Sequence, residues 1–228
     1  MTAVVWILLL VPFLLALGVQ RRLQAVFKRY RGMANHARLT GAQVARSLLD
    51  AGGLSRVRLE STPGLLSDHY DGDAGALRLS DAVAGERSVA ALGIAAHEVS
   101  HAYQDAEGSR SYRARKSIGE RLAKVAPWSG FLLIGGFWFG IPLFIVLSLV
   151  FVGGLVLFAA ATLPVELGAS RRALGLLQRA GLADDTEVRE VRQVLSAAAL
   201  TYVVGLLDRL GFFLALLFVA EAARRVMA

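Results

Sequence analysis

The sequence predicts a mainly α-helical integral membrane protein that also carries a small antiparallel β element. Of its 228 residues, 55% are hydrophobic, against about 45 to 50% in ordinary soluble domains. The mean hydropathy is +0.53, and two long stretches contain no charged residue at all. Basic residues flank these stretches, so the net charge of +7 fits orientation in a lipid bilayer better than nucleic-acid binding. We therefore expect the protein to lie in a lipid bilayer and to bind no nucleic acid.

The first expected element is a transmembrane helix over residues 1–20, which carry no charged side chain. About 20 apolar helical residues are enough to cross the hydrocarbon core. A cleavable signal peptide is the alternative, with Ala16-Leu17-Gly18 as a weak cleavage site. A signal peptide has its positive charges before the apolar run, whereas Arg21, Arg22 and Lys28 follow it here. This order favours a retained helix.

The second apolar stretch covers residues 125–165 and is again free of charge. Its length of roughly 40 residues is about twice what one crossing needs. The sequence therefore predicts a transmembrane helical hairpin, with its turn near Gly140 and Pro142. Residues 197–228 form the last expected element, a membrane-associated or transmembrane helix. Asp208 and Arg209 interrupt it. Such a pair is expected among neighbouring helices or near the interface, and a role in substrate handling is the alternative.

Residues 21–124 are the polar part of the chain, with basic clusters at both membrane-facing ends. Short basic segments beside a membrane helix stay in the cytosol, so we expect this part to face the cytosol. Thr40 and Gln43 form a capping-box pattern before a short helix that Gly52 and Gly53 would end. Alternating residues at 57–60 and 77–80 predict an antiparallel strand pair. An Ala-rich segment from about Ser88 to Glu107 predicts a helix.

That last helix carries a HExxH motif, made by His97, Glu98 and His101. Four positions on an α-helix put both imidazoles on one face, where they can bind one metal ion. Zinc lowers the pKa of a bound water toward 7, and Glu98 can serve as the general base. The chain has no cysteine, which excludes thiolate ligands and a thiol nucleophile. Two hydrogen-bonded core histidines are the alternative interpretation.

Catalytic zinc usually has three protein ligands and one open position. Glu166 is the candidate third ligand, in a helix expected to start at Pro164 and to end at Gly181. Its alternative role is that of an acidic residue in the first turn of a helix. An even number of membrane crossings must separate His101 from Glu166, and the predicted hairpin supplies two. Residues 166–196 are then helices that complete the zinc site.

The HExxH motif, the following hairpin and the segment Glu166 to Ser170 resemble the gluzincin membrane proteases, including HtpX and the CAAX prenyl proteases. The chain is most similar to the YugP-like neutral zinc metallopeptidases. Segments that carry this resemblance are Thr40-Gly41, Ser67 to Asp71, Leu77 to Ser80, Ala96 to Gln104 and Pro164 to Ala173. The resemblance implies a gluzincin-like fold with His97, His101 and Glu166 as Zn²⁺ ligands and Glu98 as general base. Gly168 stands where that family has an acidic residue, which leaves Ser170 to hydrogen-bond a ligand.

We therefore expect a zinc-dependent endopeptidase of a prokaryotic plasma membrane, acting on protein or peptide substrates in or near the membrane. A non-catalytic scaffold with a retained zinc site and a zinc hydrolase of lipids or small amides are the alternatives. Asp68 to Asp71 form either a turn with a surface histidine or a segment that contacts the substrate or supports the site residues. The strand at 77–80 would offer a free edge to a peptide. Tyr202 and Tyr70 are candidate donors to the oxyanion.

Overall fold

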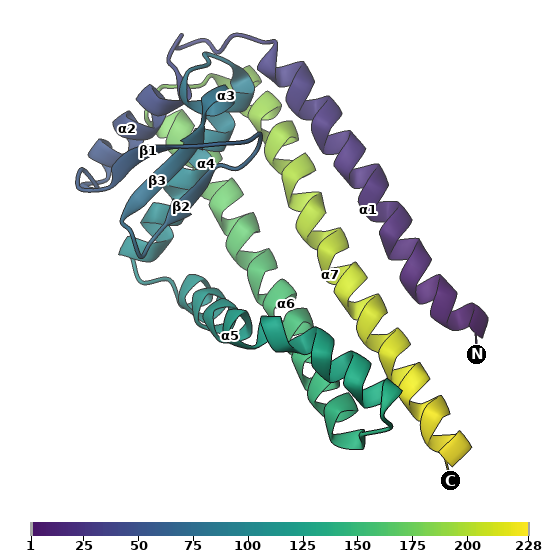
Figure 1. Cartoon of the computed structure of the whole chain (residues 1–228). Coiled ribbons are helices and arrows are strands. Elements are labelled where there is room, and N and C mark those ends of the chain that lie inside the picture. The colour runs from purple at the N-terminus through teal and green to yellow at the C-terminus, as the bar shows by residue number, and fades with distance from the viewer. Residues whose placement is uncertain (1, 228) are drawn as a thin grey trace. The chain divides into compact units, whose positions relative to one another are not determined.

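The computed structural model describes residues 2–227 and is mostly helical (Figure 1). It has seven helices and three strands in this described range. In chain order they are α1 (Thr2–Arg31), α2 (Gly41–Ala51), β1 (Arg58–Thr62), β2 (His69–Asp71), β3 (Ala76–Ser80), α3 (Asp81–Ala84), α4 (Val89–Ala106), α5 (Arg110–Trp138), α6 (Pro142–Arg179) and α7 (Asp185–Met227). The chain divides into two compact units, and four of the helices, α1, α5, α6 and α7, contribute to both.

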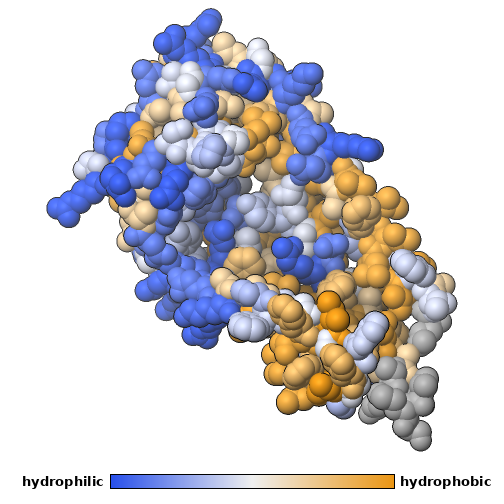
Figure 2. Space-filling view, in the orientation of Figure 1, coloured by the Kyte–Doolittle hydropathy of each residue, from blue (hydrophilic) through white to orange (hydrophobic). Residues whose placement is uncertain are grey.

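The first unit consists of residues 2–20, 113–164 and 201–227, which are helical apart from the turn before α6. Glycines lie where its helices come closest. A Cβ at Gly154 of α6 would lie 2.9 Å from Leu122 of α5, and a Cβ at Gly211 of α7 would overlap the Leu8 carbonyl of α1. Small residues of this kind allow close helix packing in membranes. Hydrophobic residues cover much of the visible surface of these helices (Figure 2).

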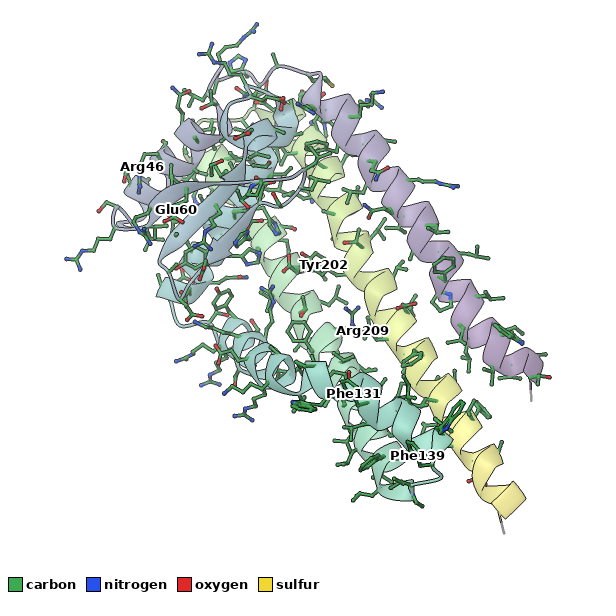
Figure 3. All side chains as sticks on the ribbon, in the orientation of Figure 1. Arg46, Glu60, Phe131, Phe139, Tyr202 and Arg209 are labelled. Atoms are coloured by element: carbon green, nitrogen blue, oxygen red, sulfur yellow. The ribbon has the colours of Figure 1, made fainter. Side chains whose placement is uncertain are left out.

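Within residues 2–227, three helices are by length and composition apolar enough to cross a membrane, namely α1, α6 and the segment of α7 from Asp185 to Ala222. Helix α5 is not among them, because charged residues fill its first half and its uncharged part begins only at Val125. The turn after α5 contains Gly140, which has a φ of 63°. Exposed aromatic side chains, Phe131 of α5 and Phe139 of the turn, lie at this end of the unit (Figure 3).

The second unit consists of residues 21–112 and 165–200. Its core joins α2, α4, the sheet and the parts of α1, α6 and α7 that belong to this unit. Leu48, Leu77, Leu92 and Leu177 are among the fully buried side chains at its centre. Thr40 caps α2 through the predicted capping box, and Ser88 caps α4 by accepting a hydrogen bond from the Ala91 amide. The limits predicted for these two helices are therefore confirmed.

The sheet is mixed, and the prediction of an antiparallel pair is wrong. β1 and β3 pair in parallel, with Arg58 opposite Ala76 and Thr62 opposite Ser80. The reason is β2, which reverses the chain and pairs antiparallel with β3 on the other side, giving the order β1-β3-β2. β3 is thus the central strand, so the free peptide-binding edge expected at residues 77–80 is also wrong.

Two helix limits also differ from the prediction. Pro164 lies inside α6 instead of starting a helix, and α6 runs without a break from Pro142 past Glu166 to Arg179. Proline is tolerated in membrane helices, because neighbouring groups can satisfy the freed carbonyl. Similarly, α7 is continuous through residues 196 and 197. The end of α6 before Gly181, whose φ is 64°, agrees with the prediction.

Candidate metal centre

Helix α4 holds the two histidines of the motif on one face. The ring centroids of His97 and His101 are 4.8 Å apart and their planes are nearly perpendicular, at 89°. Both side chains are largely shielded from solvent, with 13% and 8% exposed. A helix without proline and with small neighbours, Ala95, Ala96 and Ala102, allows the surrounding core to pack tightly around them.

Helix α6 brings Glu166 to the same place. One carboxylate oxygen, Oε2, lies 3.2 Å from Nε2 of His97 and 3.6 Å from Nε2 of His101. Among the described residues, these three form a group whose ligand atoms all lie within 4.8 Å of one another. Atoms bound tetrahedrally to zinc at 2.0 to 2.1 Å are about 3.3 Å apart. The two distances from Oε2 bracket this value, so the donor set and the position of the Glu166 carboxylate fit a zinc ion.

Glu98 is buried beside these three residues. Its Oε2 accepts a hydrogen bond from the backbone amide of Tyr70 in β2, at 3.0 Å. Burial raises the pKa of the Glu98 carboxyl, while the nearby His101 and His97 act in the opposite direction. The main chain of β2 thereby fixes the orientation of a carboxylate that adjoins the candidate metal centre.

The ring nitrogens that face away from Glu166 also have partners. Ser170, one turn after Glu166 on α6, places its Oγ 3.3 Å from Nδ1 of His97, as predicted. Gln104 places its Oε1 2.9 Å from Nδ1 of His101. We did not predict this contact of Gln104. The available signal was its position three residues after His101, which puts both side chains on the same helix face.

The segment from Asp68 to Asp71 contains the predicted turn and also contacts Glu98, while contact with a substrate stays a prediction. Asp71 accepts hydrogen bonds from the backbone amides of Asp73 and Ala74, and these bonds form the predicted turn. His69 is exposed. Asp68 accepts from the amide and hydroxyl of Ser80. The contact to the site is made by the main chain of Tyr70. Residues 69–71 form a strand, where a loop was expected.

The two candidate oxyanion donors, Tyr70 and Tyr202, lie in different compact units. The Tyr70 hydroxyl donates to Asp105 at 3.1 Å, and burial together with Asp105 keeps the pKa of Tyr70 well above its usual range. This phenol is therefore a protonated group already bound to a carboxylate. Tyr202 (Figure 3) belongs to the other compact unit, and its role in the site stays a prediction.

Comparison with known proteins agrees with this geometry. Residues 5–221 match the family described as "Putative neutral zinc metallopeptidase". The chain belongs to this family. It is also 36% identical over 193 residues to "Putative membrane protease YugP" of Bacillus subtilis (strain 168), covering 85% of this chain and 86% of that protein. No solved structure matches the chain significantly. The protein is thus a zinc metallopeptidase-family member, related to a membrane protease, with a three-residue group that could bind the metal.

Proposed function

We propose that the protein is a membrane zinc endopeptidase in which His97, His101 and Glu166 bind Zn²⁺ and Glu98 is the general base. The observation that carries this proposal is the meeting of one Glu166 oxygen with both histidine Nε2 atoms, at 3.2 Å and 3.6 Å. His97 and Glu166 lie on different helices and are 69 positions apart in the chain. A buried carboxylate, Glu98, adjoins them. This is the set of groups that hydrolysis of a peptide bond requires.

Zinc in this site would supply Lewis acidity, which acidifies a water molecule and polarises a peptide carbonyl. Glu98 would accept the proton of the attacking water on a carboxylate oxygen and donate it to the leaving amine. One Glu98 oxygen, Oε2, is held by the Tyr70 amide, which keeps the carboxylate in place. Gln104 and Ser170 hold the rings of the two histidines through their Nδ1 atoms.

The candidate membrane helices indicate that the site lies close to a bilayer, and this supports a proposal for the substrates and for the location of the protein. We propose that the substrates are extended segments of membrane or membrane-associated proteins, cut on the cytosolic side of a prokaryotic plasma membrane. The basic clusters around residues 21–31 and 110–124 support this orientation. We also propose that residues 125–165 enter the membrane and return, because His101 and Glu166 belong to one compact unit and must lie on one side of the bilayer.

The test compares wild-type protein with Glu98→Gln in detergent, measuring bound zinc and cleavage of casein in the same samples. Glu98→Gln is expected to keep its zinc and to lose about 10² to 10⁴-fold in cleavage rate, the usual contribution of a general base. Glu107→Gln is the matched control, since this carboxylate pairs with Arg172 and its side chain is 53% exposed. Its cleavage should equal that of the wild type.

Three other results would argue against the proposal. Undiminished cleavage by Glu98→Gln would rule out Glu98 as the base. Zinc binding without any peptide cleavage by the wild type would favour a scaffold. Release of lipid or small amide products, with no cleavage of peptides, would favour a hydrolase of another substrate class.

A further inference from the structure

Gln104 connects the two helices that carry the candidate zinc ligands. It lies on α4, three residues after His101, and its side chain is buried, with the residue 7% exposed. Its Oε1 is 2.9 Å from Nδ1 of His101, and its Nε2 donates to the Val165 carbonyl at 3.0 Å. Val165 directly precedes Glu166 in α6. One amide therefore contacts a candidate ligand on one helix and the backbone next to a ligand on the other.

The chemistry of these groups fixes the direction of both hydrogen bonds. A backbone carbonyl can only accept, so the NH₂ end of the Gln104 amide must face Val165. The amide oxygen then faces His101, and because this oxygen can only accept, Nδ1 of His101 must carry a proton. In the neutral ring, Nε2 is left with its lone pair free. Nε2 is the atom that lies 3.6 Å from Glu166 Oε2.

His97 has no such constraint from its own partner. Its Nδ1 faces the hydroxyl of Ser170 at 3.3 Å, and a hydroxyl can either donate or accept. Space for the Gln104 amide depends on Gly168, since a Cβ at that position would lie 3.3 Å from Nε2 of Gln104. Only His101, and not His97, therefore has a side-chain partner that determines which of its ring nitrogens carries the proton.

We propose that Gln104 is a positioning residue, which fixes the tautomer of His101 that can bind zinc through Nε2 and thereby strengthens zinc binding. This inference rests on the proposed function, in that His101 must be a zinc ligand. An acceptor on Nδ1–H also makes the opposite nitrogen a better donor to the metal. The role of Gln104 is separate from that of a simple link between α4 and α6, and two substitutions distinguish these roles.

The test measures the zinc dissociation constant of the full-length protein in detergent, by competition with a coloured chelator. Gln104→Met keeps the size but removes both hydrogen bonds, and it is expected to weaken zinc binding about 10 to 100-fold. Gln104→Glu keeps an acceptor for Nδ1–H but cannot donate to Val165 when ionised. It is expected to bind zinc within about 3-fold of the wild type, since a carboxylate is an equally good partner for a zinc-binding histidine.

The melting temperature of the metal-free protein supplies the second measurement. Both variants lose the bond to Val165, so both should melt below the wild type, while only Gln104→Met should lose zinc affinity. Gln104→Ala should also lose zinc affinity and replaces Gln104→Met if that variant does not fold. The matched control is Ser100→Ala, which removes a buried hydroxyl bonded to the Ala96 carbonyl of the same helix and should leave zinc binding unchanged.

The proposal is overturned if Gln104→Glu binds zinc as weakly as Gln104→Met, because the link to Val165 would then explain the whole effect. It is also overturned if Gln104→Met binds zinc as tightly as the wild type. His101→Ala separates this failure from failure of the proposed function. Loss of zinc in His101→Ala with normal affinity in Gln104→Met removes only the positioning role, whereas unchanged affinity in His101→Ala removes the proposed ligand set and the positioning role together.

Discussion

Each candidate ligand histidine uses one ring nitrogen toward Glu166 and the other toward a polar side chain. For His97 that side chain is Ser170, which lies on the same helix as Glu166. Since Glu166 and Ser170 are four residues apart, they occupy one face of α6 and contact the two sides of one imidazole. Orientation of His97 therefore depends on α6, whereas orientation of His101 depends mainly on Gln104 of its own helix.

Ser170→Ala is expected to weaken zinc binding by about 10-fold, the lower end of the effect of losing a partner of a ligand histidine. The distance of 3.3 Å from Ser170 Oγ to His97 Nδ1 is longer than the 2.9 Å of the Gln104 contact. The loss should therefore be smaller than for Gln104→Met. Chelator competition gives both constants, and a Ser170→Ala affinity equal to the wild type would show that His97 needs no such partner.

Sequence spacing was enough to select His97, Glu98 and His101 as candidates, because the proposed chemistry depends on neighbours within one helix turn. The need for a third ligand pointed to Glu166. By contrast, the hydrogen bond from the Tyr70 amide to Glu98 joins residues 28 positions apart and uses a backbone group that every residue type has. No side-chain pattern can signal such a contact before the packing of β2 against α4 is known.

At the scale of elements, the sequence predicted helix starts correctly where residues within one turn determine them. The capping box at Thr40 gave the start of α2, since it involves residues within one turn. The start of α4 near Ser88 followed from the Ala-rich composition of that segment. Strand pairing is non-local, and the short strand β2 was missed. Without it, β1 and β3 looked like an antiparallel pair, although they are parallel. The helix start predicted at Pro164 was wrong for a similar reason, since the groups around a proline decide whether a helix continues through it.

Close packing of α4 and α7 beneath the site provides a stability test within the second unit. Gly93 lies one turn before His97, and a Cβ there would come within 2.8 Å of Val191 Cγ1. Gly93→Ala should destabilise the protein by about 1 to 3 kcal/mol, as overpacking of a core does. Val191→Ala alone should also destabilise by leaving a cavity.

The double variant of Gly93→Ala and Val191→Ala should lose less stability than the sum of the two single changes, because the new methyl group fills space that Val191 vacates. Thermal unfolding of the four proteins in one detergent provides the comparison. Additive losses would mean that the two positions do not interact, in conflict with the close approach of α4 and α7.

At the scale of the whole molecule, membrane orientation is the main proposal to be tested. The chain has no cysteine, so single cysteines can be added without removing others. Arg56→Cys lies in the exposed segment before β1, and Phe139→Cys lies in the exposed turn after α5. With the second unit in the cytosol, a membrane-impermeant maleimide should label Phe139→Cys in intact cells and Arg56→Cys only after permeabilisation. The reverse pattern would place the metal centre outside.

The central claim is that α4 and α6 together form one zinc site. Its most direct test is the zinc dissociation constant of Glu166→Ala compared with the wild type. Glu166 is 2% exposed and contacts both histidines, so its removal should weaken binding by more than the 10 to 100-fold that loss of an outer partner costs. An unchanged dissociation constant would contradict the claim, since the metal would then be held without α6.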